Sequence, residues 1–243
     1  MKFVEVPNLP ESAACVLVSG EISASSADTL GGLGVEVIKT ELEPALYAAV
    51  RFHPDMQLCH LGGAAALCTQ TARTVLPDGM QLGVCALPDG KYPGDVFYNA
   101  ARVGDFLICN SRYTSPGILK YCAENGVEII NVAQGYAKCN ICVIDESAII
   151  TSDAGIARAC AKYPIDVLTV DDERVRLAGF SHGFFGGAAG KLRRDLLAVN
   201  GNIAAHKNTG EIIAFARQRG VDIVSLNGGD ITDVGSILAI AEK

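Results

Sequence analysis

The chain has 243 residues, of which 49% are hydrophobic and 19% are charged. This composition excludes a disordered chain, and the length fits one large domain or two small ones. Charged or turn-forming residues interrupt every apolar run before about 18 residues, so no transmembrane helix is expected. The first residues hold no apolar stretch of signal-peptide length, which predicts a cytoplasmic protein.

The net charge of −7 argues against nucleic acid or an anionic membrane as a partner. A cationic small molecule is compatible with this charge, although many enzymes carry such a charge for solubility alone. The nine cysteines are scattered among apolar neighbours and are odd in number. In a chain without a signal peptide, they are predicted to be reduced thiols in the core.

The clearest pattern in the chain occupies residues 140–171 and is typical of strand, tight turn, strand, helix and strand. Asp153 is a good helix N-cap there, and Pro164 ends the helix. Residues 195–227 repeat the pattern, with Asn200-Gly201 as a strong hairpin signal between two short apolar runs. Two such copies indicate an internal repeat.

Three further copies extend this repeat over most of the chain. They occupy residues 97–133, 56–87 and 13–40, and the last lacks its opening strand. The apolar run 235–240 has no repeat of its own and is predicted to complete the first unit by pairing with residues 14–18. Five units would then close into a ring, as one α/β domain over residues 1–243 with no exposed sheet edge. The alternative is a doubly wound sheet, which a hairpin inside every unit disfavours.

Five ββαβ units closed by a terminal strand resemble the pentein fold of the guanidino-group-modifying enzymes, in an uncharacterised bacterial branch. The resemblance implies a five-fold pseudosymmetric propeller with its chemistry at the centre, on the loops that lead into each unit. It also implies a cysteine thiolate that attacks a guanidinium carbon, a histidine that moves protons, and carboxylates that hold the planar cation.

The resemblance can be carried onto individual residues. Asp55 sits where the family keeps a guanidinium-binding aspartate. Gln134 sits where the family often has Glu, and it brings no charge. His182 matches the family histidine, but Phe184 replaces the carboxylate that follows it. Asp233 occupies the position of the nucleophile, so the chain is predicted to lack the usual catalytic cysteine.

A thiol could come instead from Cys139, beside Lys138, whose charge would lower the thiol pKa. This hypothesis predicts that iodoacetamide labels Cys139 ahead of the other cysteines. The predicted catalytic residues are therefore His182, Asp233 and Cys139. The predicted substrate-binding residues are Asp55, Gln134, Asp230 and His53. For His53, Asp230 and Asp233, a role in shaping a turn is the alternative. Asp55 could instead cap a helix or turn, and His182 could be a polar cap on its loop.

Two further motifs give no support for a metal or a cofactor. Cys139-x-x-Cys142 is a lone pair without a second one, so no metal is expected. The glycine-rich stretch 183–191 lacks the spacing of a phosphate loop or a dinucleotide fingerprint, so no nucleotide cofactor is expected. Its glycines are predicted to let the backbone pass close to the centre, or to form a flexible lid.

The sequence leaves two functions open. The first is a central site for a cationic or amide-bearing small molecule, with hydrolysis of a C–N bond as the reaction. The second is a non-catalytic binding or scaffold protein that has lost the family nucleophile, because one fold hosts many functions. In the first case Asp55 and His182 are expected to meet in one pocket. In the second, side chains such as Phe184, Phe185 or Tyr136 are expected to fill it.

Overall fold

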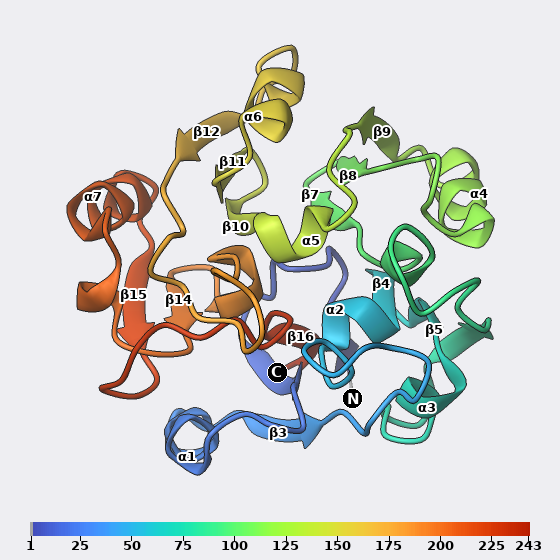
Figure 1. Ribbon diagram of the computed structural model, residues 1–243, viewed down its shortest axis with the longest axis horizontal. Helices are drawn as coiled ribbons and strands as arrows, with labels where there is room; N and C mark the ends of the chain where they lie inside the picture. Colours follow the sequence, from blue (N-terminus) through green and yellow to red (C-terminus); the bar gives the residue numbers. More distant parts are fainter. Residues whose placement is uncertain (1) are drawn as a thin grey trace.

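The computed structural model describes residues 2–243, which form a mixed α/β structure with five separate small sheets (Figure 1). Four of the sheets have three strands each, and the fifth has four strands. Within the described residues, each sheet is an open hydrogen-bonded ladder and none closes on itself. The α/β class predicted from the sequence is confirmed.

The fourth sheet along the chain shows the repeating unit most clearly. Strand β10 (Cys142–Asp145) pairs antiparallel with β11 (Ala148–Thr151), and β12 (Asp166–Thr169) pairs parallel with β11. Helix α6 (Ala154–Cys160) connects β11 to β12. It begins after Asp153, whose carboxylate accepts two backbone N–H groups of the first turn. This order of elements is the one that the sequence predicts for residues 140–171.

Three other sheets repeat this connectivity, with one antiparallel and one parallel pairing each. Their strands are β4 (Leu58–Gly62), β5 (Ala65–Cys68) and β6 (Gln81–Val84); β7 (Ala101–Val103), β8 (Phe106–Cys109) and β9 (Glu128–Asn131); and β13 (Ala189–Arg193), β14 (Leu196–Val199) and β15 (Asp222–Ser225). Their connecting helices are α3 (Gln70–Arg73), α4 (Pro116–Glu124) and α7 (Thr209–Gln218).

The remaining sheet joins the two ends of the chain. The C-terminal strand β16 (Leu238–Glu242) pairs antiparallel with β2 (Ala13–Val18), which is the pairing that the sequence predicts. Strand β3 (Glu36–Lys39) pairs parallel with β2, and the short β1 (Lys2–Phe3) pairs with the other edge of β16. Helix α1 (Ala24–Gly32) connects β2 to β3.

The connecting helices lie at the periphery, whereas the short helices α2 (Pro54–Gln57) and α5 (Ala137–Asn140) lie near the middle (Figure 1). The peripheral helices are amphipathic, because α4 buries Ile118 and Cys122 and α7 buries Ile212 and Ala216. Residues four positions apart lie on one face of a helix, so each pair can pack on the neighbouring strands.

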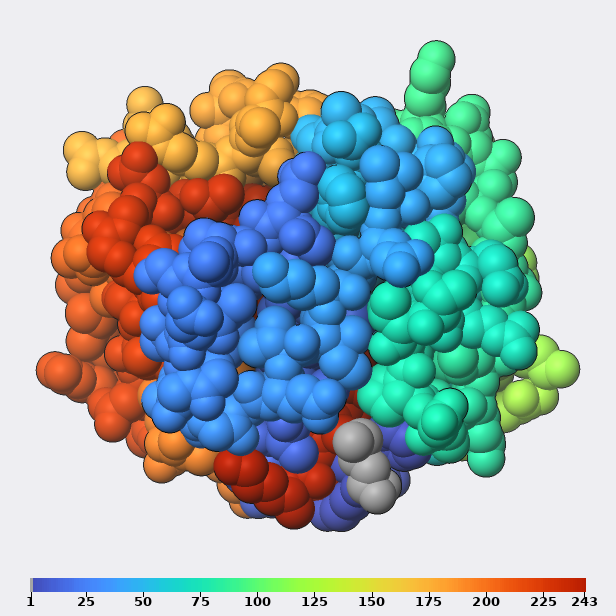
Figure 2. All heavy atoms as spheres, turned by 90° about the horizontal axis from the view of Figure 1, so that it is seen from below, coloured from blue at the N-terminus to red at the C-terminus, as the bar shows by residue number. Residues whose placement is uncertain are grey.

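Five apolar clusters hold neighbouring units together. One cluster joins the first and second units, others join the second to the third, the third to the fourth and the fourth to the fifth, and another joins the fifth to the first. Figure 2 shows the N-terminal segment, in blue, packed between the red C-terminal segment and the cyan second unit. Each buried Leu or Ile contributes roughly 1.5–3 kcal/mol, so the stability of a unit depends on its neighbours.

A cationic or imidazole side chain binds a backbone carbonyl of the hairpin turn in three of the units. His60 Nε2 lies 2.9 Å from the carbonyl oxygen of Gly63. Arg102 Nε donates to the carbonyl of Gly104 at 2.5 Å, and Lys191 Nζ donates to the carbonyl of Arg194 at 2.5 Å. Each bond satisfies a turn carbonyl that the sheet ladder leaves free.

The fifth unit differs from the sequence prediction. Strand β14 pairs with β13, which precedes it, and residues 203–205 form a 3-10 helix in place of the predicted strand. Asn200 does not start a hairpin, because its side chain is used elsewhere. Its Nδ2 donates to the backbone carbonyl of Thr232, and its Oδ1 accepts from the hydroxyl of Ser26. Asn200 therefore holds the loop that contains Thr232, and the hairpin of the fifth unit is formed by β13 and β14.

The glycine-rich stretch lets backbone segments approach closely, which is one of its two predicted roles. A Cβ added at Gly187 would lie 2.1 Å from Asp233 Oδ1, and one at Gly190 would lie 1.9 Å from the carbonyl oxygen of Ile237. Gly186 and Gly187 lie in the buried 3-10 helix η2 (Gly186–Ala188). No larger residue fits at these positions without displacing the segment that leads into β16.

We expect Gly187→Ala to lower the free energy of unfolding by about 1–3 kcal/mol, because the new methyl group overlaps the Asp233 carboxylate. Gly210→Ala in α7 is the matched control. Its Cβ would meet no atom within 4 Å, and a helical alanine adds up to about 1 kcal/mol. Chemical denaturation of both variants measures the difference, and equal stability of the two would contradict the close approach.

Candidate functional site

The segments that lead into the first strand of each unit meet at the centre of the molecule. These are α2 before β4, residues 94–100 before β7, α5 before β10, η2 before β13, and the turn 233–236 before β16. Four of these segments contribute polar side chains to a buried cluster, called here the central cluster, and η2 borders it through the backbone carbonyl of Gly186. Its members are His53, Asp55, Asn99, Lys138, Cys139, Asp233 and Ser236.

The hydroxyl group of Ser236 connects three of these segments. Lys138 Nζ donates to Ser236 Oγ at 2.8 Å, and Ser236 Oγ donates to Asp55 Oδ2 at 2.8 Å. The carbonyl oxygen of Gly186 lies 3.1 Å from the same hydroxyl group. Ser236 is fully buried, so the ammonium and the carboxylate interact through one hydroxyl group that water does not reach.

The amide group of Asn99 connects the second, third and fourth units. Its Oδ1 accepts the backbone N–H of Lys138 at 2.7 Å and that of Cys139 at 3.3 Å. Its Nδ2 lies 3.2 Å from the carbonyl oxygen of Asp55 and 3.1 Å from Cys139 Sγ. Asn99 therefore sets the start of α5 and the position of the Cys139 thiol together.

Asp233 is held by backbone groups. Its carboxylate accepts the N–H of Phe184 at 2.9 Å and the N–H of Gly235 at 3.0 Å, and His53 Nδ1 lies 3.8 Å from Oδ1. Burial raises the Asp233 pKa to about 6, although the two N–H bonds act in the opposite direction. The pKa of this carboxyl group therefore lies closer to neutral pH than that of an ordinary aspartate.

The central cluster has more acidic groups than basic ones. Burial raises the pKa of Asp55, and the neighbouring His53 and Lys138 offset only part of this effect. Burial also lowers the pKa of His53, which favours the neutral imidazole. Asp55 Oδ1 and His53 Nδ1 have no hydrogen-bond partner within the described protein. Two carboxyl groups therefore share one ammonium group, and one buried carboxyl oxygen accepts no bond from the chain.

The structure corrects the sequence hypothesis for Cys139. Cys139 is 3% exposed and lies in the central cluster, and Lys138 donates to Ser236 instead of acting on the thiol. Burial and the carboxylates of Asp55 and Asp233 raise the thiol pKa well above its ordinary value. All nine cysteines are free, as predicted, and eight of them are buried. The exposed one is Cys85.

Aromatic side chains cover the central cluster. Tyr47, Tyr136 and Phe184 pack with Cys139 and with buried apolar residues of the segments around it. We call these three residues the aromatic cap. The Tyr136 hydroxyl donates to Asp95 Oδ2 at 2.7 Å and lies 3.3 Å from the Tyr47 hydroxyl. The aromatic cap therefore fills part of the space in which the sequence analysis predicts a bound ligand.

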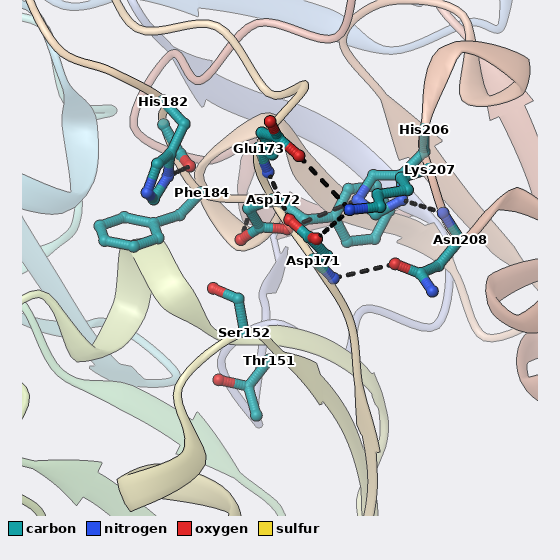
Figure 3. Close-up of polar contacts among 12 residues, drawn as sticks. Thr151, Ser152, Asp171, Asp172, Glu173, His182, Phe184, His206, Lys207 and Asn208 are labelled. Carbon is teal, nitrogen blue, oxygen red and sulfur yellow. Dashed lines mark hydrogen bonds and ion pairs between the residues drawn. The ribbon is translucent and has the colours of Figure 1, made fainter.

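An open cleft of about 500 Å³ lies beside the cap, between the fourth and fifth units. Figure 3 shows His182 and Phe184 on one side of it and the acidic residues 171–173 on the other. Gln134 also lines the cleft, where its amide donates to Asp153 Oδ2 at 3.1 Å. The structure therefore places His182 and Gln134 at the cleft, outside the central cluster that holds Asp55.

Asp230 lies apart from the other predicted site residues. Its carboxylate is 56% exposed and pairs with Arg176 at 2.6 Å. Sequence reasoning also missed the linking roles of Asn99 and Ser236. Gly235, which has a positive φ of 72°, and Ser236 stand at the start of an apolar run, and this run indicated only a strand. The signal that could have found Ser236 is its place beside a glycine, just before a strand that begins at the centre of the molecule.

The described residues provide no evident metal centre and no membrane-spanning segment. Among residues 2–243, no group of three or more His, Cys, Asp or Glu side chains is arranged to hold a metal ion. None of the helices formed by these residues has both the length and the apolar character needed to cross a bilayer.

A family model described as a family of unknown function, DUF6873, matches residues 17–238. The chain belongs to the DUF6873 family. No curated protein matches this DUF6873 chain. Among solved structures, it is similar to the inosamine-phosphate amidinotransferase of Streptomyces griseus, with 12% identity and a TM-score of 0.60 over 100% of this chain and 98% of that one.

Two further solved structures show the same likeness. DDAH from Pseudomonas aeruginosa, complexed with citrulline, is 6% identical with a TM-score of 0.52 over 88% of this chain and 92% of that one. An agmatine deiminase from C. jejuni with substrate bound is 10% identical, with a TM-score of 0.54 over 99% and 96%. All three are pentein-fold proteins, so the predicted pentein resemblance of the DUF6873 chain is confirmed.

We expect iodoacetamide to alkylate Cys85 first in the folded DUF6873 chain, because Cys85 is the exposed cysteine. Cys139 should react only slowly, since burial keeps it both protonated and inaccessible. Peptide mass spectrometry after a time course measures the order, with a denatured sample as the control in which all nine thiols react. Rapid labelling of Cys139 in the folded chain would contradict this account of its burial.

The raised pKa of Asp233 predicts a dependence of stability on pH. Between its ordinary pKa of 3.8 and its folded pKa of about 6, the folded chain binds more protons than the unfolded chain. The free energy of unfolding of the wild type should therefore fall by roughly 2–3 kcal/mol, relative to Asp233→Asn, as pH rises from 4 to 7. Urea denaturation across this range tests it, and a constant difference between the two proteins would refute it.

Proposed function

We propose that the five ββαβ units form a pseudo-fivefold propeller whose central cluster binds a guanidino, amidine or amide compound and hydrolyses a C–N bond. The observation that carries this proposal is the excess of acidic over basic groups in the central cluster. Asp55 and Asp233 share the one ammonium group of Lys138, and Asp55 Oδ1 has no donor within the described chain. A planar cation with several N–H groups supplies the missing donors and charge.

The structural relatives support the same class of ligand. The similar proteins include two amidinotransferases and an agmatine deiminase, and DDAH is seen in complex with citrulline. These activities belong to those proteins, at identities of 12% or less. The DUF6873 chain shares their fold, and it places carboxylates and a thiol at the centre of that fold.

In the proposed reaction Cys139 is the nucleophile. A cation bound between Asp55 and Cys139 favours the thiolate, because it offsets the negative charges that raise the thiol pKa. Asp55 accepts the thiol proton as the sulfur bonds to the carbon of the scissile C–N bond, and that C–N bond breaks as the leaving amine takes up a proton. Water then cleaves the C–S bond and restores the thiol. His182 serves as the general acid or base from the cleft, once Phe184 moves and opens the cleft to the central cluster.

The alternative is a non-catalytic binding or scaffold protein, and the aromatic cap favours it. Tyr47, Tyr136 and Phe184 occupy the approach to Cys139, whose thiol is buried and protonated. Binding without turnover would identify this alternative. Binding together with release of ammonia or of an amine would identify the hydrolase.

A thermal-shift screen of the purified chain against guanidino, amidine and amide compounds tests the site. A ligand at about a hundred times its Kd adds roughly 2.7 kcal/mol of apparent stability. We expect Asp55→Asn, which keeps the side-chain shape and removes the charge, to abolish this shift. Asp230→Asn is the matched control, because Asp230 is exposed and paired with Arg176, and it should bind like the wild type.

Two results would count against the proposal. The first is the absence of a shift with every compound, which would remove the guanidinium-class ligand. The second is an equal shift in Asp55→Asn and the wild type, which would place the ligand outside the central cluster.

A further inference from the structure

A second pocket lies at the other end of the inner strands. Strand β10 begins at the central cluster, just after α5, and ends at the turn beside Asp145. Strand β13 likewise begins after η2 and ends at Arg193, just before Arg194. Asp145 and Arg194 both line a pocket of about 710 Å³, formed by the N-terminal segment and by the hairpin turns of the third, fourth and fifth units. We call it the turn-side pocket.

Lys191 lines this pocket as a buried cation. The residue is 2% exposed, and its ammonium group donates to the carbonyl of Arg194. No ion pair joins Lys191 to a carboxylate anywhere in residues 2–243. His60 and Arg102 make the same kind of bond to their turns, but neither lines the pocket. The turn bond therefore uses one of the three N–H groups of Lys191, and two remain.

The other cations around the pocket already have partners. Lys2 pairs with Glu242, and Arg194 pairs with Glu11. Arg219 pairs with Asp145 and Asp166. Burial lowers the Lys191 pKa to about 8, so the ammonium form still predominates at pH 7. A buried charge without a direct ion pair is costly, and a bound counter-ion removes part of that cost.

The walls of the pocket and its outer carboxylates limit the kind of anion that fits. Exposed Glu5, Asp105 and Glu146 line it as well, and they repel a dianion more strongly than a monoanion. A single ammonium group matches a single negative charge. Several apolar side chains complete the lining. They are Val6, Leu9, Pro10, Phe106, Ile144 and Pro164.

We propose that the turn-side pocket binds the carboxylate of a small monocarboxylic acid with a compact apolar body, through the ammonium group of Lys191. The carboxylate accepts the two free N–H groups, and the apolar body packs against Phe106 and the neighbouring wall. The pocket volume lies in the range of small-molecule sites. This site is separate from the central cluster and needs no activity there.

Benzoate is a suitable probe, with benzamide as its uncharged analogue and inorganic phosphate as an anion without an apolar body. Titration of the full chain at pH 7, followed by calorimetry, measures binding. We expect benzoate to bind the wild type at least tenfold more tightly than benzamide or phosphate. We expect Lys191→Gln, which keeps a donor for the Arg194 carbonyl and removes the charge, to weaken benzoate at least tenfold.

Lys162→Gln is the matched control, because this lysine is exposed and outside the pocket, and it should bind like the wild type. Should Lys191→Gln not fold, Leu9→Trp narrows the pocket without touching the lysine and should also weaken benzoate. Equal binding of benzoate and benzamide, or unchanged benzoate binding in Lys191→Gln or Leu9→Trp, would overturn the proposal.

Discussion

The buried hydroxyl of Ser236 is the interaction on which the centre of the molecule depends. It receives a bond from Lys138 and donates one to Asp55, and so joins the first, second and fourth units. Asn99 adds the third unit through the start of α5, and Gly187 adds the fifth through its close approach to Asp233. Five segments far apart in sequence are positioned by these few polar contacts, while the apolar clusters outside them supply most of the stability.

The same contacts link folding and chemistry. A buried carboxylate without a full set of donors is unfavourable, and folded proteins retain such groups mostly where they have a role. In the central cluster the unfavourable electrostatics involve Asp55, Asp233 and Cys139, which are the groups that a cationic ligand would stabilise. In the proposed site, removal of any of them would change both stability and binding, so only matched variants separate the two effects.

Sequence reasoning succeeded where the signal was local. Asp153 capped its helix as predicted, because capping depends on near neighbours. The long-range pairing of the C-terminal strand with the first unit was also predicted, because the internal repeat showed that this unit lacked a strand. It failed where distant segments decide the outcome. Asn200 bonds Thr232 and Ser26 instead of forming a hairpin turn, and the charge of Lys138 acts on Ser236 and not on the Cys139 thiol. The separation of His182 from Asp55 also depends on how the units pack, which no local pattern encodes.

The pairing of β1 with β16 has a consequence for the order of the units along the chain. Lys2 lies opposite Glu242 in that ladder, and the two side chains form an ion pair, so the two chain ends are neighbours. A short linker could join them without disturbing a sheet, and new ends could be opened in an exposed connection between two other units. The fold is therefore compatible with circular permutation, in which any unit could come first.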